Sequence, residues 1–282
     1  MIKVLHPGIY CTIQDEGRLG FAKMGVPQAG AMDAYAAKQA SILLNHYKQE
    51  AVIEITYGQG KFEFTSNTLI ALTGADFSPK LNLKPIQMNG VYAVQKGDVL
   101  TFGERKYGAR VYLGVQGGIQ SDVVLNSKSY FPGITLEKLN KGELIHYNSI
   151  KGAVPKSLSK VKLFQEHFTE SDLVCYPGPE FERLNSLQKQ RLFKAFRVSE
   201  DNNRVGYRLN EAIANDLPPI LTSAVLPGTV QLTPSGKLIV LMRDCQVTGG
   251  YPRVLQLSDY AVSRLSQKIA GDEIRFVLDE KV

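Results

Sequence analysis

The chain has 282 residues, of which 44% are hydrophobic and 21% charged, which is the composition of a folded globular protein. The net charge of +6 would help acidic ligands approach, but Lys and Arg are interspersed with Asp and Glu, which argues against nucleic acid as a partner. No apolar segment has the length of a signal-peptide core or of a membrane span, so we expect a cytoplasmic protein with no membrane partner.

The residue types that usually carry hydrolytic chemistry show no recognisable spacing. Cys11, Cys175 and Cys245 are too widely spaced for a disulfide framework or a zinc site. The four histidines form no short metal-binding pair, and no G-x-S-x-G nucleophile elbow occurs. The sequence therefore predicts no metal ligand set, and it does not support a metal hydrolase or a serine hydrolase.

Short β-branched and aromatic runs, bounded by Gly, Asn, Asp or Pro, predict strands along most of the chain. The predicted strands are 61–65, 68–74, 91–95, 98–103, 109–118, 161–165, 172–178, 229–234, 237–242 and 273–278. Many follow one another at about 8–12 residues, the spacing of a β-sandwich or barrel. Regular alternation of strands and helices is absent, which argues against a doubly wound sheet.

Helices are few, and one polar segment divides the chain. The predicted helices are 32–44 with Asp33 as N-cap, 181–196, and 258–267 with a Ser-Asp cap. The segment 148–160 is rich in Lys, Ser, Gly and Pro and has almost no large apolar residue. It predicts an N-terminal β domain over 1–150 and a C-terminal β domain over 160–282.

A first polar cluster lies in residues 12–33, where Gln14, Asp15 and Arg18 stand among four glycines. Such a loop can present backbone N–H groups to an anion, and Arg can add a bidentate fork. The spacing matches neither standard nucleotide-binding loop. The alternative is a long loop whose shape is held by an Asp–Arg pair.

Two further features accompany predicted strands of the N-terminal half. Glu54 stands between two isoleucines, so a strand would turn it to the opposite face, either into solvent or into a site. Gly74 and Ala75 follow an apolar run, either as a simple turn or as a strand end that offers backbone amides to a ligand.

In the C-terminal half, Arg204 and Arg208 are four residues apart, either as a clamp for a carboxylate or phosphate or as surface charges. The segment "RDCQVTGGYPRV" (243–254) follows a predicted buried strand. Its Gly249 and Gly250 allow backbone angles that are closed to other residues, which a tight turn explains. A turn does not explain the polar side chains beside them, namely Asp244, Gln246, Thr248 and Tyr251.

These stretches together resemble the opening and internal motifs of one family. "IQDEGRLGFAKMGVPQAGAMD" resembles its signature T-x-Q-D-x-G-R-x-G, which continues with G-[VI]-P-x-[SA]-G-[AP]-x-D. "AVIEIT", "IALTGADF", "GARVYLGVQGGI", "RVGYRL" and "DCQVTGGYPRV" follow in the family's order. The family is the carboxyltransferase family that includes the C-type subunit of 5-oxoprolinase, KipA, allophanate hydrolase subunit 2 and a domain of urea carboxylase.

The resemblance covers nearly the whole chain and implies a mainly β fold of two cyclophilin-like β-barrel domains with a few short helices. It implies two protein partners, the KipI-type (B-type) and A-type subunits of 5-oxoprolinase, and a small amide or lactam as substrate. The implied activity is that of an ATP-dependent hydrolase, 5-oxoprolinase, with ATP bound by the complex and the chain inactive alone. Two alternatives are a non-catalytic protein that sequesters a KipI-type kinase inhibitor, and a carboxyltransferase component of urea or allophanate metabolism.

The site residues are assigned by the same resemblance, and their expected roles are electrostatic and positional because no nucleophile is evident. The expected catalytic residues are Gln14, Asp15, Arg18, Thr248 and Tyr251. The expected substrate-binding residues are Glu54, Gly74, Ala75, Arg204, Arg208, Gln231, Asp244, Gly249 and Gly250.

The chain departs from the family pattern in four segments. Two lie in the C-terminal half, "NNRVG" (202–206) for S-D-R-M-G and "QLT" (231–233) for Q-[VT]-P, and two lie in the N-terminal half. Where the family has A-N-x-L-[VL]-G-N, this chain has "ASILLNH" (40–46), with Ser41, Asn45 and His46 at the changed positions. Where the family has G-S-R-S-T and a glycine-rich loop, it has the shorter "NSKSYFPGI" (126–134), with Lys128 in place of Arg.

Overall fold

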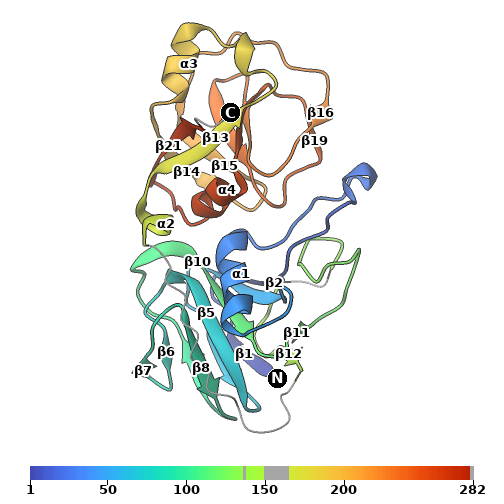
Figure 1. Ribbon diagram of the computed structural model, residues 1–282, viewed down its shortest axis with the longest axis vertical. Coiled ribbons are helices and arrows are strands. Elements are labelled where there is room, and N and C mark those ends of the chain that lie inside the picture. The colour runs from blue at the N-terminus through green and yellow to red at the C-terminus, as the bar shows by residue number, and fades with distance from the viewer. Residues whose placement is uncertain (136–137, 149–164, 280–282) are drawn as a thin grey trace. The chain divides into compact units, whose positions relative to one another are not determined.

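The computed structural model describes residues 1–135, 138–148 and 165–279 (Figure 1). The chain forms two compact units: Met1–Leu19 with Ala29–Phe168, and Gly20–Gln28 with Thr169–Val282. The predicted linker, 148–160, and most of the predicted strand 161–165 lie outside the described residues, so the boundary near 150–160 stays a prediction.

The strands of the first unit form two sheets. One has the order β11-β12-β1-β4-β9-β6-β7, with β1 Ile2–His6, β4 Lys61–Phe64, β6 Lys80–Leu81, β7 Lys84–Pro85, β9 Val99–Thr101, β11 Ile119–Gln120 and β12 Leu144–Tyr147. The other has the order β2-β3-β10-β5-β8, with β2 Tyr10–Gln14, β3 Val52–Thr56, β5 Thr68–Asp76, β8 Gly90–Val94 and β10 Tyr107–Val115. The predicted strands of this half are confirmed with shifts of a few residues at their ends.

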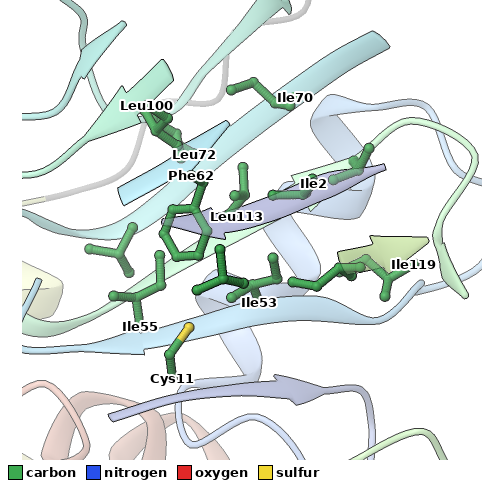
Figure 2. Packing of buried hydrophobic residues seen from close by; sticks show 14 of the residues in the cluster. Ile2, Cys11, Ile53, Ile55, Phe62, Ile70, Leu72, Leu100, Leu113 and Ile119 are labelled. Atoms are coloured by element: carbon green, nitrogen blue, oxygen red, sulfur yellow. The ribbon is translucent and has the colours of Figure 1, made fainter. Parts of the chain in front are cut away.

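Side chains from both sheets share one apolar core, which Figure 2 shows from close by. Ile2 and Phe62 come from the seven-stranded sheet, whereas Ile53, Ile55 and Leu113 come from the five-stranded one. All five side chains are fully buried. Burial of this apolar surface is the main favourable term that holds the two sheets together.

The five-stranded sheet is covered on its other face by α1 (Ala34–Leu43). Ala36, Ala37 and Ala40 bring the helix close to the sheet, where it packs on Val52 and Tyr112. The side chain of Asp33 accepts a hydrogen bond from the backbone N–H of the third helical residue and caps the helix as predicted. The strands beneath are therefore buried on both faces, and every residue of β3 is buried.

The second unit contains a closed barrel of the order β13-β20-β17-β18-β15-β14-β21. Its strands are β13 Asp172–Pro177, β14 Ala195–Asn202, β15 Gly206–Ala212, β17 Thr229–Leu232, β18 Lys237–Leu241, β20 Arg253–Leu257 and β21 Glu273–Leu278. A two-stranded sheet joins β16 Ser223–Ala224 to β19 Thr248–Gly249. The mainly β prediction is confirmed, although the described strands of the first unit form two sheets where a barrel was expected.

The helices are shorter than predicted. The segment 181–196 divides into a 3-10 turn, η2 (Phe181–Arg183), the helix α3 (Ser186–Leu192) and the first residues of β14. Asn185 and Gln188 form a capping box that begins α3 after the turn. The other short helices are α2 Glu166–Thr169, α4 Asp259–Leu265 with Ser258 as N-cap, and the 3-10 turn η1 Ala22–Met24. None of the described helices is long and apolar enough to cross a membrane.

Gly74 is required by a close approach of two strands. It has a φ of +89°, and β10 is irregular opposite it, between Tyr107 and Val111. A Cβ atom on Gly74 would lie 2.4 Å from the carbonyl oxygen of Arg110. Ala75 is fully buried in the core, and the strand continues to the next residue, so the expectation of a ligand-facing strand end at Gly74 and Ala75 is wrong.

We predict that Gly74→Ala lowers the free energy of unfolding by more than about 2 kcal/mol, because it combines a left-handed backbone with a clash against backbone. Gly97→Ala is the matched control: Gly97 has a φ of +91° but no atom within 4 Å of a built Cβ. The control is expected to lose only about 1 kcal/mol. Urea denaturation measures both, and equal losses would contradict the explanation by close approach.

Candidate functional site

Asp15 binds the segment that departs most from the family pattern. Its carboxylate accepts hydrogen bonds from Ser127 Oγ at 2.6 Å, Ser129 Oγ at 2.6 Å and the backbone N–H of Lys128 at 2.6 Å. Gly17 N–H donates a fourth at 2.9 Å. Residues 127–129 thus form a cradle around the Asp15 carboxylate. Lys128 contributes only its backbone N–H to this cradle, so the change from Arg to Lys leaves the cradle intact.

Arg18 and Gln14 lie on either side of Asp15 in the sequence and are both buried. Arg18 Nη2 donates to the carbonyl of Ser129, so Asp15 and Arg18 hold the same segment. Gln14 Nε2 donates to Thr12 Oγ1 at 3.1 Å, while Gln14 Oε1 has no hydrogen-bond partner among the residues described. The structure thus brings these three predicted residues together and gives Asp15 and Arg18 a loop-holding role.

A second departing segment, 40–46, has a left-handed residue where the family pattern has glycine. Asn45 stands where the pattern has glycine and has a φ of +54°, just after α1. Asn is the non-glycine residue that tolerates this left-handed conformation best. Ser41 Oγ accepts the N–H of Glu50, which ties the helix to the chain that follows it.

Glu54 is fully buried on the face of β3 that α1 covers, so the interpretation of a solvated outer-face carboxylate is wrong. Its Oε2 accepts hydrogen bonds from Met32 N–H at 2.8 Å and from the Tyr112 hydroxyl at 2.9 Å. Arg110 Nε lies 3.9 Å from Oε1 and balances the charge. The sheet registers place Thr12, Glu54 and Tyr112 in one row across three strands.

Tyr112 and His167 extend this network, and neither was predicted as a site residue, although Tyr112 lies in the quoted motif "GARVYLGVQGGI". Tyr112 alternates with apolar residues in a predicted strand and therefore resembles a core residue. Burial first, and then the carboxylates of Glu54 and Asp33, raise the pKa of Tyr112, so its phenol keeps the proton that it donates to Glu54. Asp33 N–H donates to the Tyr112 hydroxyl, and His167 Nε2 lies 2.8 Å from Asp33 Oδ2.

In the second unit, the two predicted arginines have separate partners. Arg204 forms a buried bidentate ion pair with Asp244, with Nε–Oδ2 at 2.7 Å and Nη2–Oδ1 at 2.9 Å. Arg208 is exposed in β15 and pairs with Asp201 at 2.7 Å. They do not form the predicted clamp, and the surface-charge interpretation holds for Arg208 alone.

Gly249 is in close contact with a neighbouring side chain, and neither Gly249 nor Gly250 is explained by its backbone angle. Neither has a positive φ, so the expected left-handed turn is absent from this part of the described chain. A Cβ on Gly249 would instead lie 2.5 Å from Gln231 Nε2. Thr248 is exposed and Tyr251 is 39% exposed, so both side chains are accessible.

Glu180 and Arg253 form an ion pair that the sequence did not reveal, since the two residues are 73 positions apart. The Arg253 guanidinium binds the Glu180 carboxylate through two atoms at 3.0 Å each. These hydrogen bonds, more than any other cause, lower the pKa of Glu180 and raise that of Arg253. Because Arg253 pairs directly with Gln231 across β20 and β17, its position is fixed next to that residue.

The polar side chains of the two clusters are hydrogen-bond donors, hydrogen-bond acceptors and charged groups. Burial raises the pKa of the Cys11 thiol, and it raises the pKa of Cys175 and of Cys245 to about 12, so these thiols are not thiolates at neutral pH. Within the described residues, no group of three or more His, Cys, Asp or Glu side chains is placed to hold a metal ion. The two polar clusters belong to different units, and each supplies fixed hydrogen-bond donors and acceptors.

We predict that Asp15→Asn destabilises the chain by about 2 kcal/mol at pH 7 and by less near pH 3. Burial raises the pKa of Asp15, but the hydrogen bonds from Ser127, Ser129, Lys128 and Gly17 outweigh it and hold the pKa below 3.8. The carboxylate therefore stabilises the fold above pH 3.8, and this contribution is lost as the pH falls through the lowered pKa.

Chemical denaturation of both proteins at the two pH values measures this change. Asp122→Asn, at an exposed carboxylate, serves as the control and should show little difference at either pH. A loss for Asp15→Asn that is the same at pH 7 and pH 3 would contradict the assigned hydrogen bonds.

A second pair of variants compares the two arginines. Arg204→Ala leaves Asp244 buried without its main partner and should cost about 3–5 kcal/mol of unfolding free energy. Arg208→Ala removes an exposed pair and should cost no more than about 1 kcal/mol. Urea denaturation distinguishes them, and similar small losses would show that the Arg204–Asp244 pair is not structural.

Comparison with known proteins agrees with the motifs and the fold. The carboxyltransferase domain family, subdomain A and B, matches residues 24–278. The chain is 30% identical to the C-type subunit of the 5-oxoprolinase of Escherichia coli (strain K12), over 98% of this chain and 91% of that protein. It is 29% identical to the corresponding protein of Haemophilus influenzae, over 98% and 90%.

The fold is also similar to a solved structure, the urea amidolyase of K. lactis, with a TM-score of 0.86 at 24% identity. That similarity covers 98% of this chain and 18% of the much longer urea amidolyase. The match to residues 24–278 spans most of the chain, and the chain therefore belongs to the carboxyltransferase domain family, subdomain A and B.

Proposed function

We propose that the chain is the C-type subunit of a 5-oxoprolinase, an ATP-dependent hydrolase that opens a small lactam to an amino acid. One observation carries the proposal: identity of 30% to such a subunit extends along 98% of this chain and 91% of that protein. A relative that matches along nearly all of both chains supports a shared role more strongly than a relative that shares only one domain with this chain. The proposal includes a cytoplasmic location, which three free cysteines favour.

The role that we assign to this chain is to bind the amide and polarise its carbonyl. Hydrolysis of a lactam builds negative charge on the carbonyl oxygen, and fixed donors that face this oxygen lower the barrier. The accessible Thr248 and Tyr251 supply hydroxyl donors of this kind, in β19 and just after it. Attack by water then needs no covalent intermediate on a thiol, consistent with the raised thiol pKa values.

ATP is assigned to the partner subunits. The arginines that were expected to bind a phosphate are engaged with Asp244 and Asp201, and the chain has neither standard nucleotide loop. These residues do not fit a nucleotide, so we derive no step of ATP chemistry on this chain. The proposed partners are the A-type subunit and the KipI-type (B-type) subunit, in keeping with the word subunit in the names of the relatives.

A second candidate is a protein that acts on urea or a urea derivative. A urea amidolyase of Lachancea kluyveri is 38% identical to this chain over 182 residues, which is 64% of this chain and 9% of that protein. Its identity is higher, but it covers less of the chain. Both candidates act on the amide bond of a small molecule, so the same binding site would serve either.

The test is ATP-dependent release of glutamate from 5-oxoproline by this chain mixed with its co-encoded A-type and B-type subunits. We expect turnover with all three proteins, and none with this chain alone or without ATP. Urea in place of 5-oxoproline tests the second candidate in the same assay. Turnover by the single chain, or a complete mixture that leaves 5-oxoproline intact, would contradict the proposal.

A further inference from the structure

The two-stranded sheet of β16 and β19, which we call the ribbon, is small and carries an exposed hydroxyl donor. Each of its strands is two residues long, and Thr248 at the start of β19 is exposed. A two-stranded sheet of this kind is only marginally stable in water by itself, so contacts with the rest of the unit must fix its position. The buried side chain of Val225, which clusters with Leu241 and Cys245, supplies the apolar part of this attachment.

Arg253 supplies a polar part of the attachment. Its Nη1 donates to the carbonyl oxygen of Ala224 in β16 at 2.9 Å. Val225 N–H donates to the Val247 carbonyl, so these two residues form a hydrogen-bonded pair across the ribbon. Hydrogen-bonded and non-hydrogen-bonded pairs alternate along antiparallel strands, and the adjoining pair of Ala224 with Thr248 is therefore non-hydrogen-bonded. The Ala224 carbonyl thus points away from β19, where Arg253 binds it, and the Thr248 side chain stands beside the residue that Arg253 holds.

Glu180 orients the guanidinium that makes this contact. Its carboxylate accepts hydrogen bonds from Arg253 Nε and Nη2 at 3.0 Å each, and from the backbone N–H of Arg253 at 2.9 Å. The backbone N–H of Glu180 donates in return to the carbonyl of Arg253 at 3.1 Å. Only 8% of the Glu180 side chain and 16% of the Arg253 side chain are exposed, so water competes little with these bonds. Glu180 therefore fixes both the side chain and the backbone of Arg253 and leaves Nη1 for β16.

This arrangement needs an arginine. A guanidinium carries its N–H groups in a planar fork, so that one edge can bind a carboxylate while the remaining nitrogen binds a carbonyl. Lysine has the same charge, but its ammonium group is a point donor that does not reproduce the fork. Arg275 forms a similar fork with Asp172, at 2.9 and 2.8 Å, between β21 and β13. Neither of those strands pairs with β16 or β19, so this second fork offers a matched comparison within the same unit.

We propose that Arg253 is a positioning residue: oriented by Glu180, it holds β16 and thereby places the Thr248 hydroxyl for its contact with the substrate carbonyl. The task of Thr248 rests on the proposed function, whereas the attachment of the ribbon rests on the contacts just described. A donor that is held in place beforehand needs no reorganisation when charge develops on the carbonyl oxygen. Loss of the attachment should therefore affect the chemical step more than it affects folding.

Hydrogen exchange of the full chain, measured residue by residue, tests the attachment without any activity. The reporters are the backbone N–H groups of Val225 and Ile220, which donate to the carbonyls of Val247 and Gly250 across the ribbon. We expect Arg253→Lys to raise the exchange rates of both reporters about tenfold, the value of one hydrogen bond from a charged donor. The N–H groups that pair β15 with β18 should keep their rates, because the opening is local.

Two further variants make this measurement decisive. Arg275→Lys changes the matched fork and should leave the exchange rates of both reporters as in the wild type. Glu180→Gln keeps the size of the side chain but removes the charge that orients Arg253, so it should raise the same two rates. Thermal melting shows whether each variant is folded. Reporters that keep their wild-type rates in Arg253→Lys, or a complete loss of the fold in both Arg253→Lys and Glu180→Gln, would overturn the positioning role.

The kinetics of the assembled complex separate positioning from stability. Arg253→Lys should lower kcat for 5-oxoproline about tenfold with little change in KM, the pattern of an interaction made only in the transition state. Thr248→Val should lower kcat at least as much. Adding Arg253→Lys to Thr248→Val should then lower kcat little further, because the arginine acts through Thr248. Independent effects that multiply in the double variant would contradict the proposal.

Failure of this inference is distinguishable from failure of the proposed function. If the complex hydrolyses 5-oxoproline and Arg253→Lys turns over at the wild-type rate, the positioning role is refuted and the function stands. If the wild-type complex leaves 5-oxoproline intact, the function is refuted together with the task of Thr248. The exchange rates of the two reporters then decide by themselves whether Arg253 holds the ribbon.

Discussion

The buried carboxylate of Glu54 is the constraint on which the first unit depends. A charge taken fully out of water is tolerated only when hydrogen bonds and an opposite charge replace the lost solvation. Tyr112 and Arg110 supply a hydroxyl and a positive charge from the neighbouring strand, and Met32 supplies a backbone N–H from the entrance of α1. The carboxylate therefore fixes where α1 begins on the sheet.

The position of α1 in turn fixes the last residues of the segment before it. Asp33 caps the helix, contacts His167 and donates its N–H to Tyr112, so the end of the 12–33 segment is held by the sheet. The beginning of that segment is held by Asp15 in the 127–129 cradle. Gly20–Gln28, between these two anchors, belongs to the second unit, so the contacts of the first unit hold the two ends of the segment and not its middle.

Much of the fold could be predicted from the sequence, because period-two alternation and helix caps are local signals. Asp33 and Ser258 were recognisable as caps from their residue types alone. For Glu54 the sequence left solvent and a buried site open, because alternation shows that it faces away from its isoleucine neighbours, but not that a helix covers that other face. The Arg204–Asp244 and Glu180–Arg253 pairs join residues 40 and 73 positions apart, a separation at which spacing in the sequence carries no signal.

The same limit applies to two buried glutamines, one in each unit. Thr12-Ile13-Gln14 in β2 and Thr229-Val230-Gln231 in β17 repeat the pattern Thr-x-Gln, once in each unit. In each case the glutamine is buried and one of its amide atoms lacks a partner in the described chain, Oε1 in Gln14 and Nε2 in Gln231. An unsatisfied buried polar atom costs about 1–3 kcal/mol, which an apolar side chain of the same size would avoid. Alternation along a strand predicts neither the burial of these two glutamines nor the amide atom that each leaves without a partner in the described chain.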